Sequence, residues 1–185
     1  MDHLNLALAT SGNYSIRLED NTMAITVSGA HKGKLKESDI MCTDLRGLPL
    51  ESKKPSSETL LHCLIYDLYP ETNAILHTHS VACNVLTRSI EGDGEIFLSD
   101  YEMLKAYRGI HTHEVTVSLP VFKNMQDMVV LSEKAISVLN KNKLPAFLIR
   151  CHGIYGWGSD MDEAIRVVEA TEMLLLCEMH QKKVK

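Results

Sequence analysis

Hydrophobic and polar residues alternate in the first part of the chain, in short runs separated by turns. Residues 14–18 and 23–27 each alternate, and the polar segment Glu19-Asp20-Asn21 lies between them. Successive side chains of a strand point to opposite faces of a sheet, so this period predicts two half-buried strands. The short polar connection predicts that they form an antiparallel hairpin. Residues 40–44 predict a further strand, which a turn at Arg46-Gly47 follows.

The hydrophobic spacing then changes to a helical period. Leucine and isoleucine recur at intervals of three and four residues between residues 60 and 68, after Ser56-Ser57 and before Pro70. This pattern predicts an amphipathic helix with a serine cap. The same criteria predict strands at residues 74–79, 115–119 and 146–149, helices at residues 81–88, 127–139 and 160–182, and a short helix at residues 101–107. The strand at residues 115–119 is expected to stop at Pro120, and residues 91–95 to form a loop.

Strands that are joined by hairpins early in the chain and separated by helices later predict an α/β fold. The expected architecture is a mainly antiparallel or mixed sheet with helices packed on it. A Rossmann fold is excluded, because no GxGxxG motif follows a strand. The chain has 185 residues and shows no internal repeat or linker. We therefore expect one domain that spans residues 1–185.

Composition and charge narrow the class of partner. Hydrophobic residues make up 45% and charged residues 23% of the chain, which is ordinary for a globular protein. The net charge of -5 provides no basic surface, so a nucleic-acid partner is not expected. No hydrophobic run approaches the roughly 18 residues of a membrane span, so no membrane partner is expected either. The five cysteines are scattered and never spaced as CxxC, which argues against disulfides and favours a cytoplasmic location.

Histidines offer the most specific chemistry in the chain. His77 and His79 end a hydrophobic strand and are separated by one residue, so their side chains leave the same face. Histidine is the commonest metal ligand, and zinc favours nitrogen donors. A catalytic zinc site usually has three protein ligands. His152 is the best third candidate, because it follows a buried strand and Gly153 permits close approach of the backbone.

A second pair of histidines, His111 and His113, has the same spacing but lies in a polar loop. By spacing alone the two pairs are equivalent, and only the strand context favours the first. The alternative for either pair is that both side chains are hydrogen-bonded or solvated without a metal. The remaining histidines are isolated and are expected on the surface or on helix faces: His3, His31, His62 and His180.

Two glutamates are candidates for acid/base chemistry beside a metal. Glu58 lies in the first turn of a predicted helix, where it could equally be a capping-box acid or a partner of the helix dipole. Glu102 lies in the predicted short helix, where it could equally be a solvated side chain. Neither alternative is excluded by the local pattern.

Small polar turns at three places could bind phosphate, through hydroxyl groups and backbone N–H groups. They contain Asn13, Ser28 with Gly29, and Ser56 with Ser57 at a predicted helix N-terminus. Ordinary turns and caps have the same composition. Together with a candidate zinc site, however, the turns suggest that the ligand is a phosphorylated small molecule.

The order of these motifs along the chain resembles the class II aldolase/adducin superfamily. The motifs are SGNYS at residue 11, VSG at residue 27, KPSSE at residue 54, HTHS at residue 77, YEMLKA at residue 101 and HGxxxxG at residue 152. The resemblance implies a three-layer α/β/α domain around a central, largely antiparallel sheet. It also implies a cyclic homotetramer with sites near subunit interfaces, and a zinc ion in each subunit held by His77, His79 and His152. His111 and His113 then have no role in the site.

The same resemblance implies roles for the remaining candidates. The phosphate contacts would be Asn13, Ser28, Gly29, Ser56 and Ser57. The acid/base would be Glu58 in the sugar-phosphate aldolases of the superfamily and Glu102 in its dehydratases. YEMLKA and the later LPVFKNMQD favour the dehydratase branch, and with it Glu102. The expected activity is removal of water from a methylthio-substituted ketose 1-phosphate in methionine salvage. The alternatives are an aldolase acting on another ketose 1-phosphate and a non-catalytic adducin-like module, which would be expected to lack the metal histidines.

Overall fold

The computed structural model of the chain contains one mixed sheet of eight strands in the order β3-β2-β1-β4-β8-β7-β6-β5. It describes residues 1, 4–142 and 144–184. The strands are β1 Asn13–Arg17, β2 Thr22–Thr26, β3 Ile40–Asp44, β4 Ala74–His79, β5 Gly94–Ser99, β6 Thr116–Phe122, β7 Ala146–Ile149 and β8 Gly153–Gly158. The helices are α1 Thr59–Leu68, α2 Val81–Thr87, α3 Met128–Leu139 and α4 Met161–Val184, with 3-10 helices η2 Lys32–Lys34, η3 Glu37–Asp39 and η4 Glu102–Ala106.

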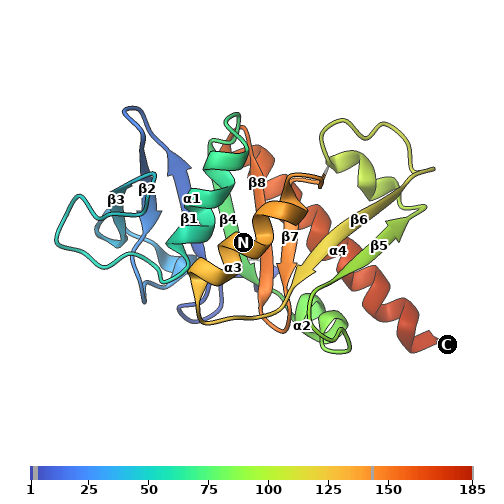
Figure 1. The fold of residues 1–185 in the computed structure, drawn as a ribbon. Coiled ribbons are helices and arrows are strands. Elements are labelled where there is room, and N and C mark those ends of the chain that lie inside the picture. Colours follow the sequence, from blue (N-terminus) through green and yellow to red (C-terminus); the bar gives the residue numbers. More distant parts are fainter. Residues whose placement is uncertain (2–3, 143, 185) are drawn as a thin grey trace.

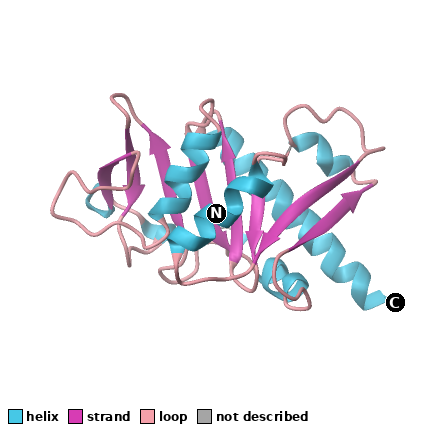
Figure 2. Ribbon diagram, in the orientation of Figure 1, coloured by secondary structure: helices cyan, strands magenta, loops and turns pink. Residues whose placement is uncertain are grey.

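Helices cover both faces of the sheet. In Figures 1 and 2, α1 and α3 lie in front of the central strands, and the long helix α4 crosses behind them. α1 contacts α3, whereas α4 contacts α2, β4 and β8. Every neighbouring pair of strands is antiparallel except β6 and β7. The predicted three-layer α/β/α fold with a largely antiparallel sheet is therefore confirmed.

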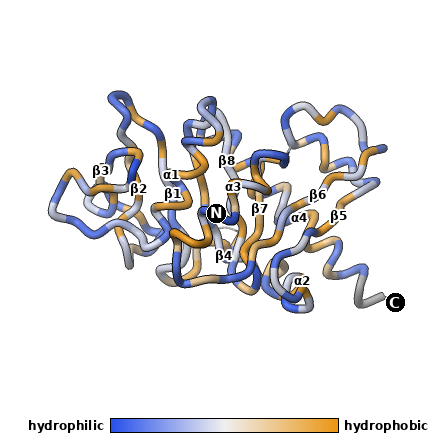
Figure 3. Tube along the Cα trace, viewed as in Figure 1, coloured by the Kyte–Doolittle hydropathy of each residue, from blue (hydrophilic) through white to orange (hydrophobic). Residues whose placement is uncertain are grey.

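The core lies on both faces of the central strands. Along β7, Phe147 and Ile149 pack in the cluster that includes α1 and α3, while Ala146 and Leu148 pack in the cluster that includes α2 and α4. Hydrophobic residues accordingly gather in the central strands and helices, and hydrophilic residues dominate the peripheral loops (Figure 3). Among the helices of the described chain, none combines the length and hydropathy that a membrane crossing requires.

Several elements have the predicted bounds, including β3, β4 and β7. β8 was not predicted, because its three glycines disfavour a strand. The packing explains two of them: a Cβ atom at Gly156 would lie 2.7 Å from Val168 Cγ2, and one at Gly158 would lie 2.6 Å from Glu163 Cβ. α4 therefore approaches this strand too closely for side chains.

Further differences lie at the β5 edge of the sheet. The expected loop at residues 91–95 gives way to β5 at Gly94, and β6 continues through Pro120 to Phe122. Pro120 is opposite Glu95 of β5, but the pairing of β6 with β7 begins only at Val121, so β6 has a partner on one side only at this residue. The short helix expected at residues 101–107 is present as the 3-10 helix η4.

Candidate metal centre and substrate pocket

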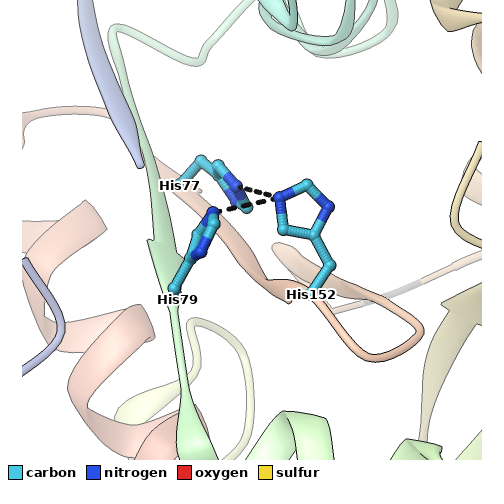
Figure 4. A group of neighbouring side chains, drawn as sticks. All are labelled: His77, His79 and His152. Carbon is cyan, nitrogen blue, oxygen red and sulfur yellow. Dashed lines mark hydrogen bonds between the residues drawn. The ribbon is translucent and has the colours of Figure 1, made fainter. Parts of the chain in front are cut away.

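The predicted histidine triad is assembled where β4 ends in the middle of the sheet. β4 pairs antiparallel with β8, and this register places His77 opposite Tyr155 and His79 opposite Gly153. The turn from β7 to β8 carries His152 to the same place. The three rings point toward one another (Figure 4), and His152 Nε2 lies 3.3 Å from His77 Nε2 and 3.0 Å from His79 Nε2. The structure thus brings together the side chains that the sequence selected.

The ring of His77 is held so that its Nε2 atom carries a lone pair. Its Nδ1–H group donates to the Ile154 carbonyl oxygen at 3.0 Å, and the ring stacks on Tyr155 with a centroid distance of 4.2 Å. Burial lowers the pKa of His77 well below its usual value, and the positive charges that His152 and His79 would carry lower it further. Burial also lowers the pKa of His79. Neutral imidazole is the form in which histidine binds a metal.

The donor set fits a zinc ion. Nitrogen ligands lie about 2.0–2.1 Å from tetrahedral zinc, and so about 3.3 Å from one another. The separations of 3.3 Å and 3.0 Å are close to that value. Hydrogen bonds among three neutral rings cannot satisfy every nitrogen that faces the centre, whereas one cation can. No other group of three metal-ligating side chains converges in this way among the residues that the structure describes.

Glycines permit the close backbone contacts that surround His77. A Cβ atom at Gly153 would lie 2.0 Å from the Thr78 carbonyl oxygen, and one at Gly12 would lie 2.5 Å from the His77 carbonyl oxygen. Gly12 also has a φ of +77°, which other residues rarely adopt. A side chain at either position would push a neighbouring segment away from β4. The close approach expected at Gly153 is confirmed.

Glu58 faces the triad from the N-terminus of α1. It occupies the N-cap position, but its side chain makes no capping hydrogen bond. Its Oε2 atom lies 3.3 Å from His77 Nε2, and its Oε1 atom lies 3.4 Å from His152 Nε2. Asn13 donates from Nδ2 to Oε2 at 2.8 Å. The capping alternative is therefore wrong for Glu58, whose carboxylate belongs to the site by position.

A cavity of about 390 Å³ opens beside the triad, with Glu58, His79 and His152 in its lining. All of the predicted phosphate contacts also line it: Asn13, Ser28, Gly29, Ser56 and Ser57. The cavity is thus bounded by the turn before β1, the turn after β2, and the segment before α1. It joins the metal-ligating nitrogens to a surface rich in hydroxyl groups.

Asn13 is the least available of these predicted contacts. Its side-chain Nδ2 atom already donates to Ser56 Oγ at 3.1 Å and to Glu58 at 2.8 Å, and the residue is 2% exposed. An amide group has only two N–H bonds. Its side chain therefore has no donor left for a ligand while these bonds are made.

Lys32 supplies a positive charge to the cavity. This residue is not among those that the sequence predicts for the site. The residue is 7% exposed, and Nζ donates to the carbonyl oxygens of Ala30 at 2.8 Å and Thr10 at 3.2 Å. Burial lowers the pKa of its ammonium group, whereas Asp39 and Glu58 raise it. The only cue in the sequence is that Lys32 follows the Ser28-Gly29 turn closely. Its neighbour Lys34, in the same 3-10 helix, is exposed.

Glu102 lies elsewhere in the chain. It begins η4, which follows the edge strand β5, four positions from β4 in the sheet order. Its side chain is 68% exposed and pairs with Lys105 at 2.6 Å and His113 at 3.2 Å. The Lys105 hydrogen bond is the main cause of a lowered pKa at Glu102. Within one chain, only Glu58 of the two predicted acids lines the cavity that contains the triad.

The histidines outside the triad differ in position and in hydrogen-bond partners. His113 pairs with Glu102, His31 caps η2 by accepting from Gly33 N–H, and His180 is exposed. His62 lies on a helix, one of the two expected positions, but on the completely buried face of α1 rather than at the surface. His3 lies outside the described residues.

Comparison with known proteins identifies relatives across almost the whole chain. The family model described as "Class II Aldolase and Adducin N-terminal domain" matches residues 1–179. A methylthioribulose-1-phosphate dehydratase of Hahella chejuensis is 49% identical over 179 residues, which cover 96% of this chain and 86% of that protein. A protein of the same name from Pseudomonas aeruginosa PAO1 is 48% identical over 173 residues, covering 92% of this chain and 84% of that protein.

Solved structures share the fold at lower sequence identity. The L-fuculose-1-phosphate aldolase of Thermus thermophilus superposes with a TM-score of 0.77 at 20% identity, over 98% of this chain and 88% of that one. A sugar-phosphate aldolase of Thermotoga maritima superposes with a TM-score of 0.67 at 19% identity, over 99% and 90% of the two chains.

Proposed function

The chain belongs to the class II aldolase and adducin family, as its motifs predicted, and we propose that it is a lyase that removes water from 5-methylthioribulose 1-phosphate. The product would be 2,3-diketo-5-methylthiopentyl 1-phosphate, in methionine salvage. The observation that carries the proposal is the single cavity in which metal-ligating histidines, a carboxylate and a lysine meet. The substrate is taken from the name of relatives that are 45–49% identical to this chain.

The proposed cofactor is a zinc ion in each subunit, held by His77, His79 and His152. When bound, zinc supplies Lewis acidity that polarises the carbonyl group of a ketose and so acidifies the neighbouring C–H bond. The role of the protein is to hold the three imidazoles convergent, with a ring nitrogen of each directed at the centre of the triad. The hydrogen bond from His77 to the Ile154 carbonyl does this for one ring, because it fixes the tautomer that leaves Nε2 free.

The phosphate end of the substrate is proposed to bind on the side of the cavity away from the histidines. Ser28, Gly29, Ser56 and Ser57 offer hydroxyl and backbone N–H donors there. Lys32 adds the charge that a phosphate requires, and one of its three N–H bonds is not used by the Ala30 and Thr10 carbonyls.

Dehydration requires a base for the C3 proton and an acid for the departing C4 hydroxyl. The motifs favoured Glu102 as the base, but Glu58 is proposed for this role instead, because its carboxylate accepts a hydrogen bond from Asn13 and faces the triad. Glu102 is proposed as the second proton carrier, supplied by a neighbouring subunit of the homotetramer that the family resemblance implies. Its exposed position beyond the sheet edge is compatible with that role.

The activity is tested with purified protein. Metal analysis should find zinc in stoichiometric amount, and incubation with 5-methylthioribulose 1-phosphate should yield a product that has lost one water molecule. Absence of a bound divalent metal, or an unchanged substrate with the metal-loaded protein, would contradict the proposal.

The free state of all five cysteines supports a cytoplasmic location.

Shared sites can be tested by mixing two inactive variants. Glu58→Gln and Glu102→Gln should each abolish turnover with zinc retained. Co-assembly in equal amounts should restore about a quarter of the wild-type activity, because a site that draws one residue from each of two neighbours in a ring is intact in one arrangement of four. Inactivity of the mixture despite demonstrated co-assembly would contradict a contribution of Glu102 from a neighbour.

An aldolase acting on another ketose 1-phosphate is the second candidate. It is favoured by the position of Glu58 beside the triad, where the resemblance assigns the acid/base of the aldolases. The two reactions differ in the bond that breaks. Release of dihydroxyacetone phosphate from the substrate would identify the aldolase.

A further inference from the structure

A buried series, or chain, of hydrogen-bonded polar side chains runs from Tyr66, near the end of α1, to the candidate base. The Tyr66 hydroxyl lies 2.9 Å from Ser15 Oγ, which lies 2.7 Å from His62 Nδ1. His62 Nε2 makes a short hydrogen bond with Asn13 Oδ1. Asn13 Nδ2 then donates to Glu58 Oε2 at 2.8 Å. These residues come from α1, β1 and the segment before α1, so the chain crosses the layer between sheet and helix.

The donors and acceptors of this chain allow only one direction. Asn13 presents its amide nitrogen to Glu58 and its carbonyl oxygen to His62, and an amide nitrogen only donates whereas an amide oxygen only accepts. His62 must therefore carry its proton on Nε2, and its Nδ1 atom must accept from the Ser15 hydroxyl. Ser15 then accepts from Tyr66. Every N–H or O–H bond in the chain points toward Glu58.

Burial keeps the members of the chain in the protonation states that this direction needs. Ser15 and Tyr66 are each 2% exposed, and His62 is completely buried. Burial lowers the pKa of His62 to about 3, so the ring is neutral and carries a single proton. Burial also raises the pKa of Tyr66, so its hydroxyl remains a donor. Arg17 packs over the Tyr66 ring at 4.7 Å and closes the outer end.

We propose that His62 is a positioning residue for Glu58, acting through Asn13. By fixing the Asn13 amide it directs an N–H bond at the Glu58 carboxylate, which is thereby held turned toward the triad. This rests on the proposed function of Glu58 as the base of the dehydration. It also gives Asn13 a role inside the protein rather than on the substrate.

The surroundings of Glu58 indicate why such a device is needed. Among the described residues, the ion-pairing groups within 4.0 Å of its carboxylate are His77 and His152, whose nitrogens the metal would occupy. An acceptor hydrogen-bonded by Asn13 is held in one orientation even when those nitrogens are engaged. The buried Tyr155 hydroxyl is a second group that faces Glu58: burial raises the pKa of Tyr155, and the nearby Glu58 carboxylate raises it further.

Two substitutions of His62 separate positioning from packing. His62→Phe retains a ring but removes the N–H donor to Asn13, so the Asn13 amide that donates to Glu58 is no longer fixed. This variant should lower kcat about 10- to 100-fold and change KM by less than about twofold. His62→Gln restores an amide N–H near the position of Nε2 and should recover most of kcat. Zinc content should be unchanged in both variants.

A matched pair of tyrosines provides the control. Tyr66→Phe removes the first donor of the chain and should lower kcat about two- to fivefold. Tyr69 is close to Tyr66 in sequence but is not part of the series of hydrogen bonds that leads to Glu58. Tyr69→Phe removes a hydroxyl that donates to the Leu139 carbonyl at 2.7 Å, and it should leave kcat and KM unchanged. Equal losses in the two variants, equal losses in His62→Phe and His62→Gln, or no loss in His62→Phe would overturn the proposal.

A nitrogen NMR spectrum tests the chain without any turnover. In the metal-free wild-type protein at neutral pH, His62 should be the tautomer protonated on Nε2, with its signal assigned by its loss in His62→Gln. A tautomer protonated on Nδ1 would overturn the proposal. If the wild-type protein bears this tautomer but does not dehydrate the substrate, the proposed function fails and the hydrogen-bonded direction stands.

Discussion

Replacing Lys32 by methionine removes the buried positive charge from the cavity but retains much of the side-chain volume. In the structure, two of the three N–H bonds of Nζ are directed at the Thr10 and Ala30 carbonyl oxygens, which leaves one for a phosphate oxygen. A hydrogen bond between charged partners contributes about 1.5–3 kcal/mol, which corresponds to a change of about 10- to 150-fold in binding. We therefore expect KM to rise by that factor.

The assay is steady-state turnover of 5-methylthioribulose 1-phosphate, with thermal melting to confirm that each variant is folded. Lys34→Met is the matched control, because Lys34 lies in the same 3-10 helix but is exposed, and it should leave KM unchanged. A phosphate-free substrate analogue should bind equally well to wild-type protein and Lys32→Met. An unchanged KM in Lys32→Met, or an equal rise in Lys34→Met, would refute the assignment of Lys32 to the phosphate.

Three further predictions follow from the geometry of the site. Gly153→Ala should abolish zinc binding, measured by metal analysis, because its Cβ would meet the Thr78 carbonyl oxygen at 2.0 Å; full zinc occupancy in a folded variant would contradict this. The metal-free protein should lose stability as the pH falls below about 6.5, because His62 and His77 take up protons in the unfolded chain but stay neutral when buried in the folded one. Each of these histidines should lower the free energy of unfolding by about 1.4 kcal/mol per pH unit. Denaturant unfolding should show a shallower decline in His62→Gln, and an equal slope in both proteins would be inconsistent with a neutral His62. His79→Ala, like removal of the metal by a chelator, should abolish turnover while the fold is retained, and zinc should restore activity only to the chelated wild-type protein.

Much of the fold could be predicted because the hydrophobic period reports directly on burial. β4 and β7 lie in the sheet interior, and their uninterrupted hydrophobic runs indicate this. β8 is equally buried, but Gly156 and Gly158 are required by the close approach of α4, which is a tertiary contact that no local pattern records. β5 was not predicted for a different reason: it lies at the sheet edge, and only Leu98 of its side chains is buried, so its hydrophobic pattern is weak.

The candidate site was predictable where spacing carries the chemistry. His77 and His79 are two residues apart on one strand, so their convergence follows from strand geometry. Lys32 and His62 were missed, because Lys32 lies outside the predicted elements and His62 looks like a surface residue of a helix until the neighbouring segments are in place. Their roles depend on Thr10, Ser15 and Asn13, which are distant in sequence. The missing information was therefore tertiary contact rather than residue type.

The fate of the C3–C4 bond tests the central claim most directly. The zinc-loaded protein is incubated with 5-methylthioribulose 1-phosphate that carries deuterium at C3, and the products are analysed by mass spectrometry. Dehydration predicts an intact carbon chain that has lost one water molecule together with the deuterium from C3. Dihydroxyacetone phosphate that retains the deuterium would show instead that the C3–C4 bond is cleaved, and would contradict the assignment of this chain as a dehydratase.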